Sequence, residues 1–239
     1  MKLFHLFFQR EILAPMLALT FSSGICALLV LARIVFVGNV GCAFLVWNLL
    51  LAWLPLVFAL LIRERYANGE RRGWKLYSLG AAWLLFFPNA PYIFTDLIHL
   101  TSKFRGHFWV DMVLILLCAL TGLMIGFVSL FLVQSVVADR HGRILSWLFV
   151  ACVAGLSGVG VFIGRFLRLN SWDILLRPQN FFQHADNWAA APFADATPYV
   201  FPALFAVFLF IAYLMFYALT QWPLNFQIEK QRTNPPAQS

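Results

Sequence analysis

Charged residues are scarce in this sequence: they make up 11% of its 239 residues, whereas hydrophobic residues make up 62%. About a quarter of the residues of a soluble domain are charged, so the composition excludes an ordinary globular protein. The four cysteines all fall inside long apolar runs or at their ends, which excludes a disulfide framework between outer loops. The abundant residues are apolar and aromatic, with 26 Phe and 9 Trp. The chain is therefore expected to lie in a lipid bilayer.

Six segments are long and apolar enough to cross a bilayer, which takes about 20 residues. Each must be helical there, because unpaired backbone groups find no water in lipid. The expected spans cover residues 13–32, 40–62, 74–94, 110–137, 144–164 and 198–222. The sequence thus predicts an all-α membrane protein that forms one polytopic domain over residues 1–239, with a polar, disordered cytoplasmic tail at 223–239.

The net charge of +7 follows from membrane topology. If the basic loop between the second and third spans is cytoplasmic, both termini are cytoplasmic as well, and eleven of the 17 Lys and Arg residues lie inside. The six outside are Arg33, Lys103, Arg105, Arg165, Arg168 and Arg177. Positive residues favour the cytoplasmic side of a membrane, which supports this orientation. The lipid bilayer is then the expected partner, and no nucleic acid is needed to explain the basic balance.

The stretch Phe86–Leu100, "FFPNAPYIFTDLIHL", interrupts the third span with prolines and polar residues. Pro88 and Pro91 each lack a backbone N–H and crowd the preceding turn, which predicts a break in the helix in the outer half of the bilayer. Asn89 or Ala90 is expected to cap a second short helix, with Pro91 in its first turn, where proline is tolerated.

In that short helix, Tyr92, Asp96 and His99 are spaced i, i+4 and i+7 and form one polar stripe, which Asn89 extends towards the membrane. Asp96 and His99 are the candidate catalytic residues, because a carboxylate and an imidazole can act as general acid or base. The alternative is that Asp96 and His99 serve only the structure, in an ion-pair network that ties the third span to the fifth.

A second polar cluster follows the fifth span, in a segment expected to lie along the outer interface. Asn170 is expected to cap a helix there, with Asp173 near its positive end. Asp111, at the start of the fourth span, lies on the same side of the membrane. One extracytoplasmic polar site is therefore predicted from Asn89, Tyr92, Thr95, Asp96, His99, Asp111, Arg165, Arg168, Asn170, Trp172 and Asp173.

Small residues predict where the helices touch. Gly122 and Gly126 in the fourth span, and Gly160 and Gly164 in the fifth, have the GxxxG spacing. In lipid, helices associate by close backbone approach, which small residues permit. The fourth and fifth spans are therefore expected to form the packed centre.

Two strings of this sequence, "PNAPYIFTDLIHL" and "GRFLRLNSWDIL", resemble the marker motifs of a bacterial integral-membrane family known only as domain of unknown function 1361. The resemblance is specific, because strings such as Pro88–Tyr92 and Asn170–Asp173 are unusual. It covers most of the chain, about residues 14–222. It implies a multi-pass protein of the bacterial cytoplasmic membrane and brings no established activity with it.

Three classes of function stay open. A membrane enzyme would use the outer arginines to hold the phosphate of a lipid-linked precursor or a phospholipid head group. A small-solute transporter would use the broken third span as a discontinuous helix, although the break lies in the outer half and few polar residues occur at the midplane. A scaffold would have the same polar residues paired with one another and would meet an envelope partner at the outer face.

No metal or cofactor is expected. Histidines and carboxylates occur on the outer side, but none of the HxxxH, HExxH or CxxC spacings of zinc sites is present.

Overall fold

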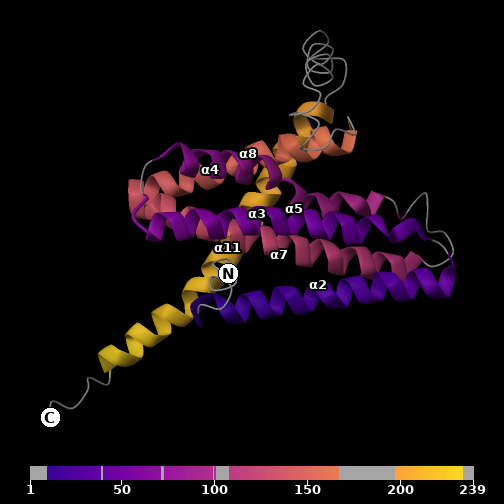
Figure 1. Cartoon of the computed structure of the whole chain (residues 1–239), viewed down its shortest axis with the longest axis horizontal. Coiled ribbons are helices and arrows are strands. Elements are labelled where there is room, and N and C mark those ends of the chain that lie inside the picture. Colours follow the sequence, from indigo (N-terminus) through magenta and orange to yellow (C-terminus); the bar gives the residue numbers. More distant parts are fainter. Residues whose placement is uncertain are drawn as a thin grey trace, which may run out of the picture.

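The computed structural model describes residues 10–38, 40–70, 73–98, 100, 108–166 and 197–233. Every regular element among these residues is a helix (Figure 1). The elements are α2 (Arg10–Val37), η1 (Val40–Cys42), α3 (Phe44–Ala67), α4 (Trp74–Phe86), α5 (Asn89–Tyr92), η2 (Ile93–Ile98), α7 (Phe108–His141), α8 (Arg143–Phe166) and α11 (Thr197–Thr233). The all-helical class predicted from the sequence is confirmed for this part of the chain.

Five of the helical segments are long and apolar enough to cross a membrane: Leu13–Val37, Val40–Ala67, Phe108–His141, Arg143–Phe166 and Tyr199–Gln221. They coincide with five of the six expected spans. The expected span at 74–94 is divided among α4, α5 and η2 instead. At the other end of the chain, α11 runs to Thr233 and so extends a helix into the segment expected to be a disordered tail. Residues 234–239 lie outside the described part.

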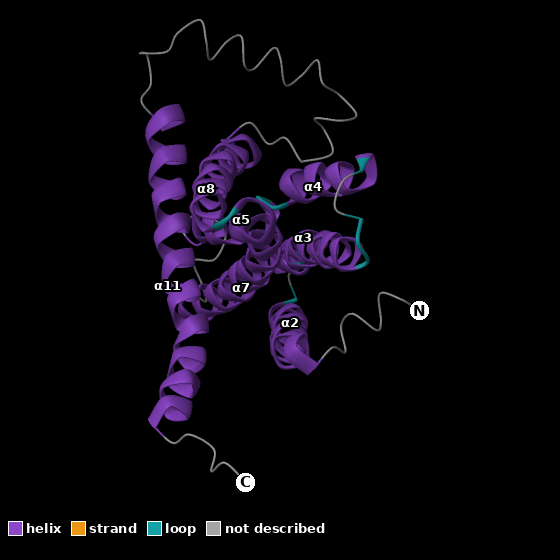
Figure 2. Ribbon diagram, turned by 90° about the vertical axis from the view of Figure 1, so that its left-hand side faces the viewer, coloured by secondary structure: helices purple, strands orange, loops and turns teal. Residues whose placement is uncertain are grey.

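The central helix is α7, which contacts α2, α3, α5, η2, α8 and α11. It is also the most deeply buried of the five apolar spans. Figures 1 and 2 show α2, α3 and α7 side by side, whereas α11 crosses the group obliquely on the side of α8. The expected centre was the pair of the fourth and fifth spans; in the structure α7 is central and α8 lies between it and α11.

The segment from Trp74 to Ile98 is interrupted once and then changes from an α-helix to a 3-10 helix. α4 ends at Phe86, the turn residues Phe87 and Pro88 follow, and α5 begins at Asn89. The N-cap of α5 is Pro88 and makes no side-chain capping bond, which corrects the expectation that Asn89 or Ala90 caps it. Pro91 falls in the first turn of α5, as expected, because its missing N–H is not needed there.

Glycines of α7 let this segment approach closely. A Cβ added at Gly122 would lie 2.7 Å from Ile93 Cδ1 and 3.0 Å from the carbonyl oxygen of Ala90. A Cβ at Gly126 would lie 2.8 Å from Ala90 Cβ. The separation from Ala90 Cβ is too short for a real Cβ atom, and those at Gly122 would require Ile93 and the backbone of Ala90 to shift, so the glycines permit α5 and η2 to pack on α7 at this distance.

Glycines of α8 play the same role on two sides. A Cβ at Gly160 would lie 2.8 Å from Cγ of Pro88, and one at Gly158 would lie 2.3 Å from the carbonyl oxygen of Pro202 on α11. At Gly155, in contrast, nothing lies within 4 Å of the added atom. Close helix contact thus depends on particular glycines of α8 and not on its whole small-residue face.

We expect Gly158→Ala to lower the free energy of unfolding by about 1–3 kcal/mol, the usual cost of overpacking, because the new methyl group meets a backbone atom that cannot rotate away. Gly155→Ala is the matched control on the same helix. It should leave stability unchanged or raise it by up to about 1 kcal/mol through helix propensity. Thermal unfolding of the purified protein in detergent measures both. Equal melting temperatures for the two variants would contradict the close α8–α11 contact.

Candidate functional site

Asp96 on η2 and Arg165 in the last turn of α8 form a buried ion pair. Nη2 of Arg165 donates to Oδ1 of Asp96, and their side chains are 13% and 2% exposed. The two residues are far apart in sequence and come from different helices. The sequence-predicted neighbours Asp96 and Arg165 are thus brought into direct contact.

Thr95 and Tyr92 also contact the guanidinium of Arg165. Nε and Nη2 of Arg165 donate to the hydroxyl of Thr95 at 2.9 and 2.7 Å. That hydroxyl in turn donates to the carbonyl oxygen of Tyr92 at 2.7 Å. The guanidinium also lies over the Tyr92 ring, 4.7 Å from its centroid, where the ring quadrupole attracts a cation. Arg165 therefore holds residues of α5 and η2 against the end of α8.

The helix type explains why Thr95 belongs to this group. The sequence predicted an α-helical stripe of Tyr92, Asp96 and His99, spaced for 3.6 residues per turn. The structure has a 3-10 helix over Ile93–Ile98, in which residues three apart lie one above the other. The Thr95 hydroxyl reaches the carbonyl oxygen of Tyr92 three residues back, and the guanidinium bridges Thr95 and Asp96.

Asn48 on α3 is a partner that the sequence analysis missed. Its side-chain amide donates to Oδ2 of Asp96 at 2.9 Å. Both carboxylate oxygens of Asp96 thus accept a hydrogen bond, one from α8 and one from α3. A signal was available, because Asn48 is the only amide, hydroxyl or charged side chain between residues 40 and 62.

Asp111 belongs to a second ion pair and is not joined to Arg165. Nε and Nη2 of Arg33, on α2, donate to its two carboxylate oxygens at 2.6 and 2.9 Å. Both side chains are buried, at 9% and 1% exposed. Arg33 was expected at the outer side but not in the site. It is the only charged residue between Glu11 and Arg63, and such an isolated charge at membrane depth needs a partner.

The two pairs lie at the same end of the bundle, where α2 and α8 end and α3 and α7 begin. Asn89 is the first residue of α5, one turn before Tyr92 and Ile93. The remaining predicted site residues, His99, Arg168, Asn170, Trp172 and Asp173, lie outside the described residues.

A cavity of about 400 Å³ adjoins the Asp96–Arg165 pair. Thr95 and Arg165 provide polar groups in its wall, and phenylalanines of α11 form much of the rest, among them Phe201, Phe205 and Phe208. Such a space can take an apolar group with one hydrogen-bonding end. Among the described residues, His, Cys, Asp and Glu do not gather in any group of three that could hold a metal ion.

Comparison with known proteins gives a family without an activity. The model of the family described as "Protein of unknown function (DUF1361)" matches residues 47–214, which is more than half of the chain and includes Asn48, Asp96, Asp111 and Arg165. Searches of the curated proteins and of the solved structures found no match. The chain, with five helices able to span a membrane, belongs to the DUF1361 family of proteins of unknown function.

Proposed function

We propose that this protein is a non-catalytic scaffold of the bacterial cytoplasmic membrane, which presents a rigid outer face to an envelope partner. In this proposal the chain crosses the membrane six times, with both termini in the cytoplasm and the third span broken at Pro88–Pro91. The Asp96–Arg165 pair then lies at the extracytoplasmic interface. The excess of Lys and Arg on the side of the termini supports this orientation.

The observation that carries the proposal is the bonding of Asp96. Both of its carboxylate oxygens accept hydrogen bonds, and its side chain is 2% exposed. A general base must reach a substrate proton, and a side chain that is 2% exposed is poorly placed to do so. The buried carboxylate, bonded at both oxygens, instead ties three helices together, here α3, η2 and α8.

The buried polar side chains of α7 support a role in helix packing and not a role in a transport path. Thr121 contacts the thiol of Cys26 on α2 at 3.6 Å. The hydroxyl of Ser129 accepts from the indole of Trp83 on α4 at 3.3 Å. Gln134 accepts from Tyr213 on α11. Each pair joins α7 to a different helix, which is the usual role of polar residues between membrane helices.

A membrane enzyme that acts on a lipid-linked or phospholipid head group is the second candidate. One observation favours it: the cavity of about 400 Å³ that Thr95, Arg165 and the phenylalanines of α11 line. Arg165 would hold a phosphate or carboxylate there, and Asp96 or His99 would transfer the proton.

The topology predicts the outcome of reporter fusions. Alkaline phosphatase, which is active only outside the cytoplasm, should be active when inserted at residues 101–107. It should be inactive when inserted at Gly69 or Gly142, and a fluorescent protein at the C-terminus should be fluorescent. Activity at Gly69 equal to that at 101–107 would overturn the proposed orientation.

The ion pair predicts a strong energetic coupling. Asp96→Ala and Arg165→Ala should each lower the free energy of unfolding by about 3–5 kcal/mol, because each leaves a buried charge without its partner. The double variant should cost less than the sum. The matched control is the exposed pair Arg65–Glu70, with side chains 35% and 52% exposed, for which the coupling should stay below about 1 kcal/mol. Thermal unfolding in detergent measures both cycles, and additive losses at Asp96 and Arg165 would contradict a structural pair.

A neutral replacement separates scaffold from enzyme. Asp96→Leu combined with Arg165→Met keeps the volume and removes both charges, a change that is often neutral for stability. If the protein is a scaffold, this double variant should accumulate in the membrane. It should also correct the envelope defect of a strain that lacks the protein. A variant that accumulates and melts like the parent but fails to correct that defect would favour the enzyme hypothesis. Asp96→Asn, which keeps the shape, is the milder companion variant.

A further inference from the structure

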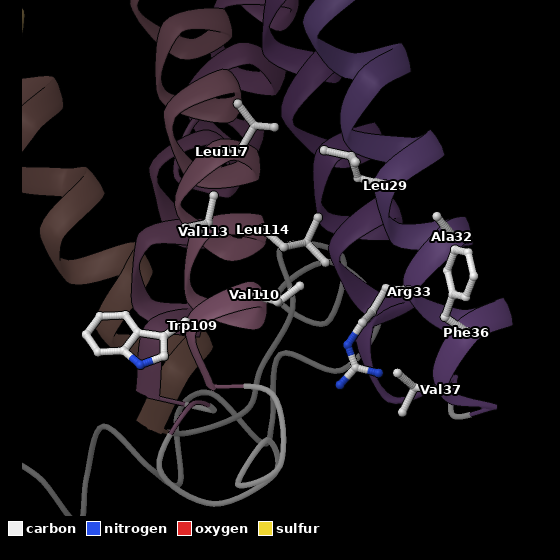
Figure 3. Close-up of a pocket in the computed structure, with 10 residues that line it drawn as sticks. All are labelled: Leu29, Ala32, Arg33, Phe36, Val37, Trp109, Val110, Val113, Leu114 and Leu117. Carbon is white, nitrogen blue, oxygen red and sulfur yellow. The ribbon is translucent and has the colours of Figure 1, made fainter.

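An apolar groove of about 620 Å³ runs between the end of α2 and the start of α7 (Figure 3). Nine of its ten lining residues are apolar, and the tenth is Arg33. Its walls face outward: the side chains of Phe36, Val110 and Val113 are 88%, 60% and 60% exposed. These helices are able to span a membrane, and in the proposed topology the medium that meets the groove is lipid.

Arg33 leaves a donor group unused in this groove. Its Nε and Nη2 donate to Asp111, whereas Nη1 makes no hydrogen bond within the described part of the chain. The side chain is only 9% exposed. A donor in apolar surroundings is costly when it lacks an acceptor. A ligand with an oxygen atom near Nη1 would therefore be stabilised in this groove.

The groove is polar at one end and apolar at the other. α2 ends at Val37, and Arg33 lies one turn before that end. In the proposed topology the lipid head groups begin at this level. Leu29 lies one turn deeper, and Leu117 is six residues beyond Asp111 on α7, about 9 Å along an ideal helix. A ligand that fits both ends has an oxygen-rich head and an aliphatic chain.

We propose that the groove holds one acyl chain of a membrane phospholipid, and that Nη1 of Arg33 donates to a phosphate or ester oxygen of the same lipid. This inference is independent of the scaffold role, and it concerns a site separate from the Asp96–Arg165 cluster. It requires only that the chain lies in a membrane with this end at the head-group level.

The charge of the site determines which lipids it takes. Asp111 neutralises Arg33 through two hydrogen bonds, so the groove offers a hydrogen-bond donor without a net positive charge. Phosphodiester and ester oxygens occur in anionic and zwitterionic phospholipids alike. The site therefore binds both kinds with similar affinity, unlike the clusters of Lys and Arg that select anionic lipids.

Native mass spectrometry of the full chain tests the proposal. The protein is purified in dodecyl maltoside and titrated with dioleoylphosphatidylglycerol or dioleoylphosphatidylcholine in mixed micelles. The parent should hold one lipid more tightly than the rest, with affinities for the two lipids within a factor of about three. Leu29→Trp, which fills the groove, should remove that lipid, whereas Leu28→Trp should keep it, because Leu28 faces lipid at 59% exposed but does not line the groove.

Two further variants keep the test decisive. Val113→Trp fills the groove from the α7 wall and replaces Leu29→Trp if that variant melts early. Arg33→Met combined with Asp111→Leu removes the ion pair without leaving a buried charge and should weaken the tight lipid by about tenfold or more, since one hydrogen bond from a charged donor contributes that much.

Three results would overturn the proposal. The first is an equal number of bound lipids in the parent and in both groove-filling variants. The second is a preference of more than about tenfold for phosphatidylglycerol, which would assign binding to net charge elsewhere. The third is a lipid-free dimer that Leu29→Trp dissociates, because the groove would then hold a second copy of this chain.

Discussion

A buried carboxylate needs a cation beside it, and Arg165 provides that cation for Asp96, whose side chain is 2% exposed. The cost of leaving either charge buried without its partner is several kcal/mol, so the ends of η2 and α8 cannot separate without a large penalty. Asn48 and Thr95 supply further hydrogen bonds: Asn48 donates to Asp96 at 2.9 Å, and Arg165 donates to Thr95 at 2.7 and 2.9 Å. The positions of α3, η2 and α8 at this end of the bundle follow from that single requirement.

The pair can form only because the backbones come unusually close. Gly122 and Gly126 on α7 admit Ala90 and Ile93, and Gly160 on α8 admits Pro88. A methyl group at Gly126 or Gly160 would meet Ala90 Cβ or the Pro88 ring at 2.8 Å, so the segment that leads to Asp96 would have to shift. The glycines therefore provide the space for the α5–η2 segment, and Arg165 holds the 3-10 helix at the end of that segment.

The sequence was sufficient for the local features and not for the long-range partners. Long apolar runs predicted five helices that the structure contains, and the acidic and basic residues of two motifs predicted the region where Asp96 meets Arg165. The α-helical period failed over Ile93–Ile98, since a 3-10 helix aligns Thr95 with Tyr92. Asn48 and Arg33 were missed because they lie outside the two motifs, each alone in a long apolar run. No local spacing encodes which residue of another helix such a lone polar residue meets, here 48 and 78 residues away.

The two ion pairs differ in a way that separates structure from binding. Each carboxylate oxygen of Asp96 accepts a hydrogen bond from another helix, Oδ2 from Asn48 and Oδ1 from Arg165, so its partners lie inside the protein. Arg33 and Asp111 satisfy each other through two bonds, and one nitrogen of Arg33 faces a groove with nine apolar lining residues. In water that nitrogen would be solvated at no cost. In a bilayer the available acceptors are the head-group oxygens of lipids. The same guanidinium therefore bonds to Asp111 inside the protein and offers a donor to a lipid outside it.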